Sequence, residues 1–256
     1  MRISLFSMTR TVLENEGLQW RAVAPPAFAV RAAELMSAVL EARDLAEHAS
    51  GKVLHVRLGY SRTFESEPHY RALSPVIRER AAELSGLDVL GIVSGVDREP
   101  LPRALLEILD EVRGALPDLT VHAGEFEGHA SVDRTLALAP RAIGHGVRSV
   151  ESPHTLEALR QAGVTLEVCP MSNHLLIHDE LAALTHQHHA HPLVTLQQHQ
   201  VHAVLGSDDP TPMHTDFGSE WKRALHLGAD EARLLADTAR RWAELKPRTG
   251  RPSRRE

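Results

Sequence analysis

The sequence predicts an α/β fold of the TIM type, a parallel (β/α)8 barrel that is incomplete because its first strand is missing. From about residue 53 onward, short apolar runs alternate with stretches whose apolar residues recur every three to four positions. This is the pattern of strand–helix units that feed a parallel sheet. The length of 256 residues also suits one barrel domain. We therefore expect a single barrel over residues 1–245, followed by a basic, disordered tail over residues 246–256.

Seven strands are expected in chain order. The candidates are residues 3–6, 53–58, 89–93, 119–123, 142–144, 164–168 and 201–206. A long helix is predicted over residues 27–47, after Pro25 and Pro26, because proline suits the first turn of a helix. Gly114 and Gly163 follow two later helical stretches, where a glycine C-cap is expected. Seven strands are one short of a closed eight-stranded barrel.

Composition excludes several classes of protein. The net charge is -6, and the basic residues form no stripe outside the tail, which argues against nucleic-acid and anionic-membrane partners. No apolar run approaches the roughly 20 residues of a membrane span, and the start of the chain lacks a signal-peptide pattern. The single cysteine, Cys169, fits a reducing compartment. We expect a cytoplasmic protein, and the absence of a glycine-rich phosphate loop argues against nucleotide-cofactor chemistry.

Polar side chains follow the later predicted strands at the point where each strand ends. His122 and Glu125 stand at the end of the run over residues 119–123, and His145 directly follows the run over residues 142–144. Asp208 and Asp209 follow the last run, over residues 201–206. Barrel enzymes build their active sites at these carboxyl ends. Each group alone could be an ordinary strand end, and an Asp-Asp-Pro sequence is a common turn. Their joint occurrence at successive strand ends favours a single site with metal or acid–base chemistry.

The ordered set of motifs resembles the signature of the adenosine deaminase family. The matching segments are His122-Ala123-Gly124-Glu125, Ile143-Gly144-His145-Gly146, Glu167-Val168-Cys169-Pro170-Met171-Ser172-Asn173, His191-Pro192-Leu193 and Ser207-Asp208-Asp209-Pro210. The resemblance extends over nearly the whole chain. It implies a metal-dependent barrel hydrolase that removes the amino group of a purine.

The resemblance also implies a role for individual residues. His122 and Asp208 would be ligands of one Zn²⁺ ion per chain, and Glu125 would be the proton shuttle. His145 would orient and polarise the attacking hydroxide, while Asp209 would hold a purine ring nitrogen. The loop over residues 91–97 also resembles a substrate loop of the family, and it would contribute Gly95 to substrate binding. Bound zinc can lower the pKa of its water from 15.7 to about 7, which would supply the nucleophile.

One feature of the family has no counterpart in this sequence. The family carries a His-x-His pair on its first strand that supplies two metal ligands, whereas residues 2–6 resemble its second strand. We therefore expect that the first strand is missing, through a start codon assigned too far downstream, a shortened gene, or a protein that has lost catalysis. The histidine-rich run over residues 186–191 contains a His-x-His spacing, but it follows no apolar strand, so we expect a solvated loop there.

The first of three functions is the one that we predict on this basis, and the other two are its alternatives. The first is deamination of a purine nucleoside, adenosine to inosine and ammonia, with the small-molecule nucleoside as the partner. The second is adenine deamination, because the metal-site motifs are shared. The third is a non-catalytic barrel without a competent metal site. The sequence leaves the oligomeric state and the particular purine undetermined.

Overall fold

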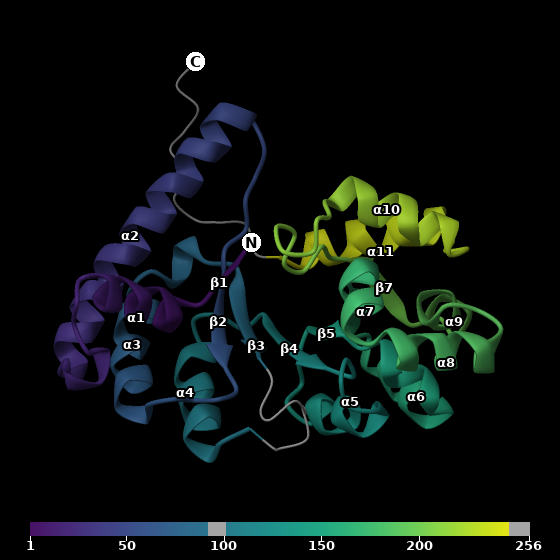
Figure 1. Cartoon of the computed structure of the whole chain (residues 1–256), viewed down its shortest axis with the longest axis horizontal. Helices are drawn as coiled ribbons and strands as arrows, with labels where there is room; N and C mark the ends of the chain where they lie inside the picture. Colours follow the sequence, from purple (N-terminus) through teal and green to yellow (C-terminus); the bar gives the residue numbers. More distant parts are fainter. Residues whose placement is uncertain (92–100, 246–256) are drawn as a thin grey trace. The chain divides into compact units, whose positions relative to one another are not determined.

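The computed structural model describes residues 1–91 and 101–245, and its contacts divide this part of the chain into two compact units (Figure 1). The first unit comprises residues 1–91 and 101–119, and the second comprises residues 120–245. Both units are built from parallel strands that alternate with helices. The expectation of a single domain over residues 1–245 stays a prediction.

The first unit holds three parallel strands in chain order. They are β1 (Arg2–Ile3), β2 (Arg57–Ser61) and β3 (Gly86–Leu90), with β2 paired to both of the others. The helices of this unit are α1 (Leu5–Asn15), η1 (Trp20–Ala22), α2 (Pro25–Ser50), α3 (Glu67–Glu79), η2 (Ala81–Glu83) and α4 (Arg103–Arg113). Helix α2 packs against α1 and α3, and α3 packs against α4.

An aromatic cluster fills the core of the first unit. The ring of Phe6 stacks on Tyr70 with 4.3 Å between centroids, and it meets Trp20 edge to face. Helix α2 presents Phe28 to the same cluster. Such rings bury large apolar areas and gain from edge-to-face contacts, so this cluster is a major source of stability for the unit.

The second unit holds four parallel strands, again in chain order. They are β4 (Leu119–Ala123, within the unit from Thr120 onward), β5 (Ala142–His145), β6 (Thr165–Val168) and β7 (His202–Leu205). The helices are α5 (His129–Leu136), η3 (Val147–Glu151), α6 (Pro153–Ala162), α7 (Pro170–Leu176), α8 (His178–His188), α9 (Pro192–Gln198), α10 (Phe217–His226) and α11 (Glu231–Glu244). Helix α11 packs on β7, and α10 packs on α7.

The core of the second unit is aliphatic. Ile143 and Leu166, which are register partners on β5 and β6, are fully buried, as are Leu159 on α6 and Leu193 on α9. This core packs residues of the strands against residues of α6, α8 and α9. The strand ends, where polar residues gather, are therefore carried by a well-packed scaffold.

The alternation of strands and helices that the sequence predicts is confirmed, with three displaced strands. The strand predicted over residues 89–93 begins three residues earlier, as β3 (Gly86–Leu90), and its predicted end lies outside the described residues. The strand over residues 119–123 lies where it was predicted, whereas the strand predicted over residues 53–58 begins only at Arg57, because its partner strand begins opposite at Gly86. The strand predicted over residues 3–6 is wrong beyond Ile3. Leu5 and the residues after it form α1, since Ser4 caps that helix and its buried residues recur with helical spacing.

The histidine-rich run is also different from the prediction. Helix α8 continues to His188, and His189 ends it with a left-handed backbone, so the first half of the run is helical and only residues 189–191 form a loop. Its side chains are largely exposed, as predicted, while His191 is buried. Among the described residues, none of the helices combines the length and apolar character that a membrane span requires. The basic tail, residues 246–256, lies outside the described residues.

Candidate active site

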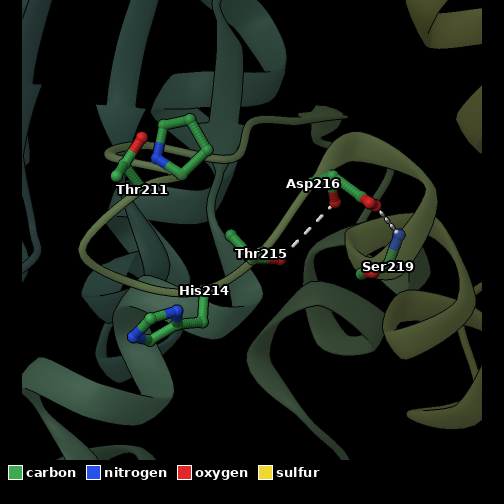
Figure 2. A pocket seen from close by; sticks show the side chains of 6 residues that line it. Thr211, His214, Thr215, Asp216 and Ser219 are labelled. Atoms are coloured by element: carbon green, nitrogen blue, oxygen red, sulfur yellow. Dashed lines mark hydrogen bonds between the residues drawn. The ribbon is translucent and has the colours of Figure 1, made fainter.

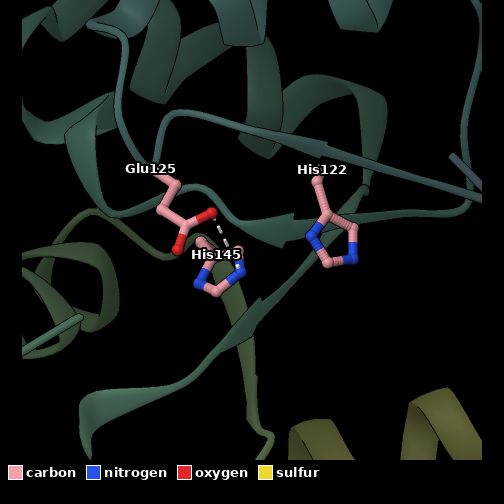
Figure 3. A group of neighbouring side chains, drawn as sticks. All are labelled: His122, Glu125 and His145. Atoms are coloured by element: carbon pink, nitrogen blue, oxygen red, sulfur yellow. Dashed lines mark ion pairs between the residues drawn. The ribbon is translucent and has the colours of Figure 1, made fainter. Parts of the chain in front are cut away.

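Two imidazoles and a carboxylate meet at the carboxyl ends of β4 and β5 (Figure 3). His122 comes from β4, Glu125 from the turn after it, and His145 is the last residue of β5. One ligand atom of each side chain lies within 4.8 Å of those of the other two. Three residues that the sequence analysis singled out are thus brought together.

The pairing of β4 and β5 places His122 beside a residue without a side chain. His122 is the register partner of Gly144, and the imidazole of His122 occupies the space that a Cβ at position 144 would fill. Glycine at this position therefore makes room for the ring. A larger residue on β5 would exclude His122 from its present place.

His145 lies next to this ring because the backbone of β5 changes at its end. Side chains alternate along a strand, which would turn residue 145 away from the face that residue 144 shares with His122. His145 instead has a φ of 61°, in the left-handed region. Its ring centroid lies 5.2 Å from that of His122, edge to face.

The surroundings of His145 determine how its ring is protonated. The side-chain amide nitrogen of Asn173 on α7 lies 3.1 Å from Nδ1 of His145. Because an amide nitrogen can only donate, Nδ1 accepts, and the proton of the neutral ring is on Nε2. Nε2 lies 3.4 Å from Glu125 Oε2 and 3.9 Å from Asp208 Oδ2. The N–H group of the ring therefore faces two carboxylates.

Asp208 follows β7 and is held by α7. Its Oδ2 accepts a hydrogen bond of 2.6 Å from the hydroxyl of Ser172, and its φ of 53° is again left-handed. Asp208 thus borders the site next to His145, although the three-residue cluster itself is formed by His122, Glu125 and His145. Consecutive residues of α7, Ser172 and Asn173, orient one carboxylate and one imidazole of the site.

The donor set fits a divalent metal ion. Catalytic zinc sites combine histidine nitrogen with carboxylate oxygen and leave a position open. Here His122 offers a ring nitrogen and Glu125 a carboxylate oxygen, and these two atoms lie within 4.8 Å of each other. His145, whose Nε2 carries its proton, would stand beside the ion as a hydrogen-bond donor rather than as a ligand. Asp208 adds a second carboxylate on the other side of His145. Glu125 and His145 are 8% and 2% exposed, so a charge placed between them would be poorly screened by water.

The other two predicted site residues, Asp209 and Gly95, are not part of the cluster of His122, Glu125 and His145. Asp209 is exposed, directly after Asp208, at the start of the loop that leads to α10. That loop and the start of α10 border an open surface hollow of about 470 Å³, which is lined by Pro210, Thr211, His214, Thr215, Asp216 and Ser219 (Figure 2). Gly95 lies outside the described residues.

Sequence reasoning missed one connection in this region. Glu220 on α10 is only 1% exposed, and its Oε2 accepts a hydrogen bond of 3.0 Å from the backbone N–H of Met171, beside Ser172. The signal in the sequence was weak, because Glu220 stands 49 residues from Met171 and lies in an amphipathic helix, where a glutamate is usually on the solvent-exposed face. Its burial is visible only in the folded chain.

Comparison with known proteins identifies relatives of this chain. The sequence model of the family described as adenosine deaminase matches residues 18–245. The adenine deaminase of Chelativorans sp. (strain BNC1) is 37% identical over 150 residues, which are 57% of this chain and 44% of that protein. The adenosine deaminase of Erwinia tasmaniensis is 32% identical over 181 residues, which are 70% of this chain and 50% of that protein. The matched part therefore spans about half the length of these relatives or less.

Solved structures confirm the predicted fold class. The adenine deaminase of Arthrobacter aurescens superposes with a TM-score of 0.64 at 20% identity, covering 93% of this chain and 78% of that one. An amidohydrolase of Burkholderia ambifaria, solved with bound zinc, gives a TM-score of 0.70 at 17% identity, covering 85% of this chain and 60% of that one. The described strands and helices are those of a TIM-type barrel, represented here by seven parallel strands.

Proposed function

We propose, from the premise that the chain belongs to the adenosine deaminase family, that it is a hydrolytic purine deaminase in which Glu125 and His145 transfer and stabilise protons. The reaction replaces the amino group on C6 of a 6-aminopurine by oxygen, with water as the other substrate and ammonia as the other product. The observation that supports this most directly is the convergence of His122, Glu125 and His145 at the ends of adjacent strands.

The proposed metal site would use His122 and Asp208, as the family resemblance implies, with His145 and Glu125 beside it. A bound divalent cation would lower the pKa of a coordinated water towards neutrality and so make a nucleophile available. His122 would contribute the imidazole that Gly144 accommodates. Ser172 would orient the Asp208 carboxylate through their 2.6 Å hydrogen bond.

The protein's own groups would handle the protons. Glu125, nearly buried and 3.4 Å from Nε2 of His145, would take a proton from the attacking water and pass it to the ring nitrogen next to C6. The Nε2–H group of His145 would donate to the oxygen as negative charge develops on it. The second proton of the same water, which remains on the hydroxyl now bonded to C6, would pass to the amino group. The C–N bond would then break, which releases ammonia and leaves the 6-oxopurine. Asp209 is the proposed acceptor for another ring nitrogen of the purine.

The substrate we favour is the free base, adenine. Relatives named adenine deaminase share 37% and 36% identity with this chain over 150 and 137 residues. Adenosine is the alternative, because the adenosine deaminase relative matches a larger part of the chain, 70%. The two differ only in the ribose, so the same chemistry serves both.

The test is to follow ammonia release and the loss of substrate absorbance with adenine and with adenosine. The 256-residue chain is purified with zinc, and a second protein that adds the upstream reading frame is assayed beside it. We expect turnover of at least one purine, and its loss by more than 100-fold in Glu125→Gln. Glu180→Gln, an exposed glutamate on α8, is the matched control.

The metal is tested separately from turnover. We expect bound zinc by elemental analysis, reduced in His122→Ala and unchanged in His186→Ala, which replaces an exposed histidine. Folded proteins that bind zinc and release ammonia from neither purine would contradict the proposed reaction. Folded proteins that bind no zinc would contradict the proposed metal site and favour a non-catalytic barrel.

A further inference from the structure

We propose that Glu220 is a positioning residue that fixes the helix turn on which both Ser172 and Asn173 stand. The proposal deepens the proposed function and rests on it for its catalytic consequence. Its starting point is a carboxylate on α10 that lies within the protein, where only 1% of Glu220 is exposed. Burying a carboxylate is costly unless hydrogen bonds compensate, so its partners are informative.

The first partner of Glu220 is the N-terminal turn of α7. The N–H groups in the first turn of a helix have no acceptor within the helix, and a side chain of the N-cap residue usually supplies one. Cys169, the N-cap of α7, makes no such hydrogen bond. The N–H of Met171 is instead accepted by Glu220 Oε2 at 3.0 Å, so α10 caps α7 from outside.

The second partner lies in the loop that follows Asp208 and Asp209. The hydroxyl of Thr215 donates to Glu220 Oε1 at 2.6 Å, and Thr215 lines the hollow of that loop (Figure 2). Glu220 itself is held at a fixed place because Asp216 caps the start of α10 through the Ser219 N–H at 2.7 Å. One carboxylate therefore connects the segment after β6 to the segment after β7.

These two segments carry the contacts that orient the site. Directly after Met171 come Ser172, which bonds Asp208, and Asn173, which bonds His145. Both are buried, at 1% and 0% exposure. If the first turn of α7 shifts, the amide nitrogen of Asn173 moves away from Nδ1 of His145. The ring then loses the contact that places its proton on Nε2, opposite Glu125.

A buried carboxylate of this kind could also be merely structural. In the described part of the chain, no lysine, arginine or histidine forms an ion pair with Glu220, so its role is to accept hydrogen bonds rather than to balance a charge. Glutamine can do the same: its oxygen can accept from Met171 while its nitrogen donates to the Thr215 hydroxyl. Leucine, of similar size, can do neither. This pair of variants separates positioning from packing.

The experiment measures which ring nitrogen of His145 carries the proton. ¹⁵N-labelled protein is examined by long-range ¹H–¹⁵N NMR, with the His145 signals assigned from their absence in His145→Gln. We expect two well-separated ring nitrogen signals, as for a single neutral tautomer, in the parent chain and in Glu220→Gln. In Glu220→Leu we expect the two signals to move towards each other, because both tautomers become populated. Glu180→Leu, at an exposed position, is the control and leaves them unchanged.

Turnover gives a second readout with a defined pattern. With the purine that the parent protein deaminates, we expect kcat to fall about 10- to 100-fold in Glu220→Leu, the range typical of groups that orient catalytic residues. KM should stay within about twofold, and Glu220→Gln should restore most of kcat. Because the NMR readout needs no turnover, an absence of deamination with the expected NMR shift would reject the proposed function and leave the positioning role standing.

A milder variant keeps the test decisive if Glu220→Leu does not fold. Thr215→Val removes one of the two hydrogen bonds of Glu220 and conserves shape. We expect a smaller convergence of the His145 signals in the same direction. A folded Glu220→Leu protein, or a folded Thr215→Val protein in its place, whose His145 signals match those of the parent would overturn the proposal.

Discussion

Gly144 and His122 are register partners across β4 and β5, and a methyl group at position 144 would lie 2.6 Å from Cδ2 of the His122 ring. The same added carbon would be within 2.9 Å of Nε2 of that ring. The atoms in the way belong to a side chain, which can rotate, rather than to the backbone. The fold can therefore accept a larger residue here only by giving up the position of an imidazole of the proposed metal site.

The first prediction concerns this pair. Gly144→Ala should lower zinc affinity by about 10-fold or more, because the His122 ring has to leave its place, and should cost about 1–3 kcal/mol in the free energy of unfolding. Metal titration against a chelator and urea denaturation measure the two effects. Gly114→Ala is the control, since a Cβ there meets nothing within 4 Å. Unchanged zinc affinity in Gly144→Ala would show that the ring does not hold metal in its present position.

The second prediction concerns the partner of His145. Asn173→Leu should lower kcat about 10- to 100-fold, because His145 loses the donor that places its proton towards Glu125. The variant should also bring the two ring nitrogen signals of His145 closer together. Asn173→Asp should shift the preferred proton position to Nδ1, since a carboxylate only accepts. If both variants keep the parent spectrum, the tautomer is set by another group.

The third prediction is a pH dependence of stability. Burial, followed by the nearby charge of Arg223, lowers the pKa of His191 from 6.5 to about 4. The folded protein therefore keeps this ring neutral while the unfolded chain takes up a proton at higher pH. The contribution is fully present above pH 6.5 and is lost as the pH falls towards 4, by roughly 3 kcal/mol in total. Urea denaturation at pH 7 and pH 4.5 measures the loss.

A substitution isolates this effect. Nδ1 of His191 accepts from the Leu193 N–H at the start of α9, and asparagine is also favoured at such positions. We expect His191→Asn to lose less stability between pH 7 and pH 4.5 than the parent chain, whereas His154→Asn, at an exposed position, should follow the parent. If the free energy of unfolding falls equally between pH 7 and pH 4.5 in all three proteins, groups other than His191 cause the pH dependence.

The fourth prediction tests the scaffold that carries the site. Leu159 on α6 is fully buried in the core of the second unit, while Leu235 on α11 is 56% exposed. Leu159→Ala should lower the free energy of unfolding by about 2–5 kcal/mol, because it leaves a cavity in a packed core. Leu235→Ala should change it by less than about 0.5 kcal/mol. Denaturant titrations of the two variants supply the comparison, and equal losses would contradict the packing described for α6.

Much of the strand order, and the grouping of the strand-end residues, could be predicted from the sequence. The strand over residues 119–123 was predicted correctly. The residues after it could be expected near other strand ends, because the carboxyl ends of parallel strands lie at one edge of the sheet. The strand predicted over residues 3–6 was wrong beyond Ile3, because a short apolar run fits a strand or a helix equally well. There the hydroxyl of Ser4 accepts from the Ser7 N–H and selects the helix.

Other properties of the site depend on contacts that no local pattern contains. The proton on Nε2 of His145 follows from Asn173, which is 28 residues away in the chain. The burial of Glu220 follows from its contact with α7, and a glutamate in an amphipathic helix carries no sign of it. Such contacts are set by how helices pack on the finished sheet. They become visible only when the coordinates are known.

His145 and Asp208 both hold left-handed backbone conformations, which cost an ordinary residue roughly 1 kcal/mol or more and cost glycine almost nothing. Glycine at either position would remove the backbone strain of the positive φ, but it would also remove a side chain of the proposed site. Selection for stability and selection for chemistry therefore pull these two positions in opposite directions. If the proposed reaction is correct, the imidazole at position 145 and the carboxylate at position 208 are kept for chemistry at a cost in stability.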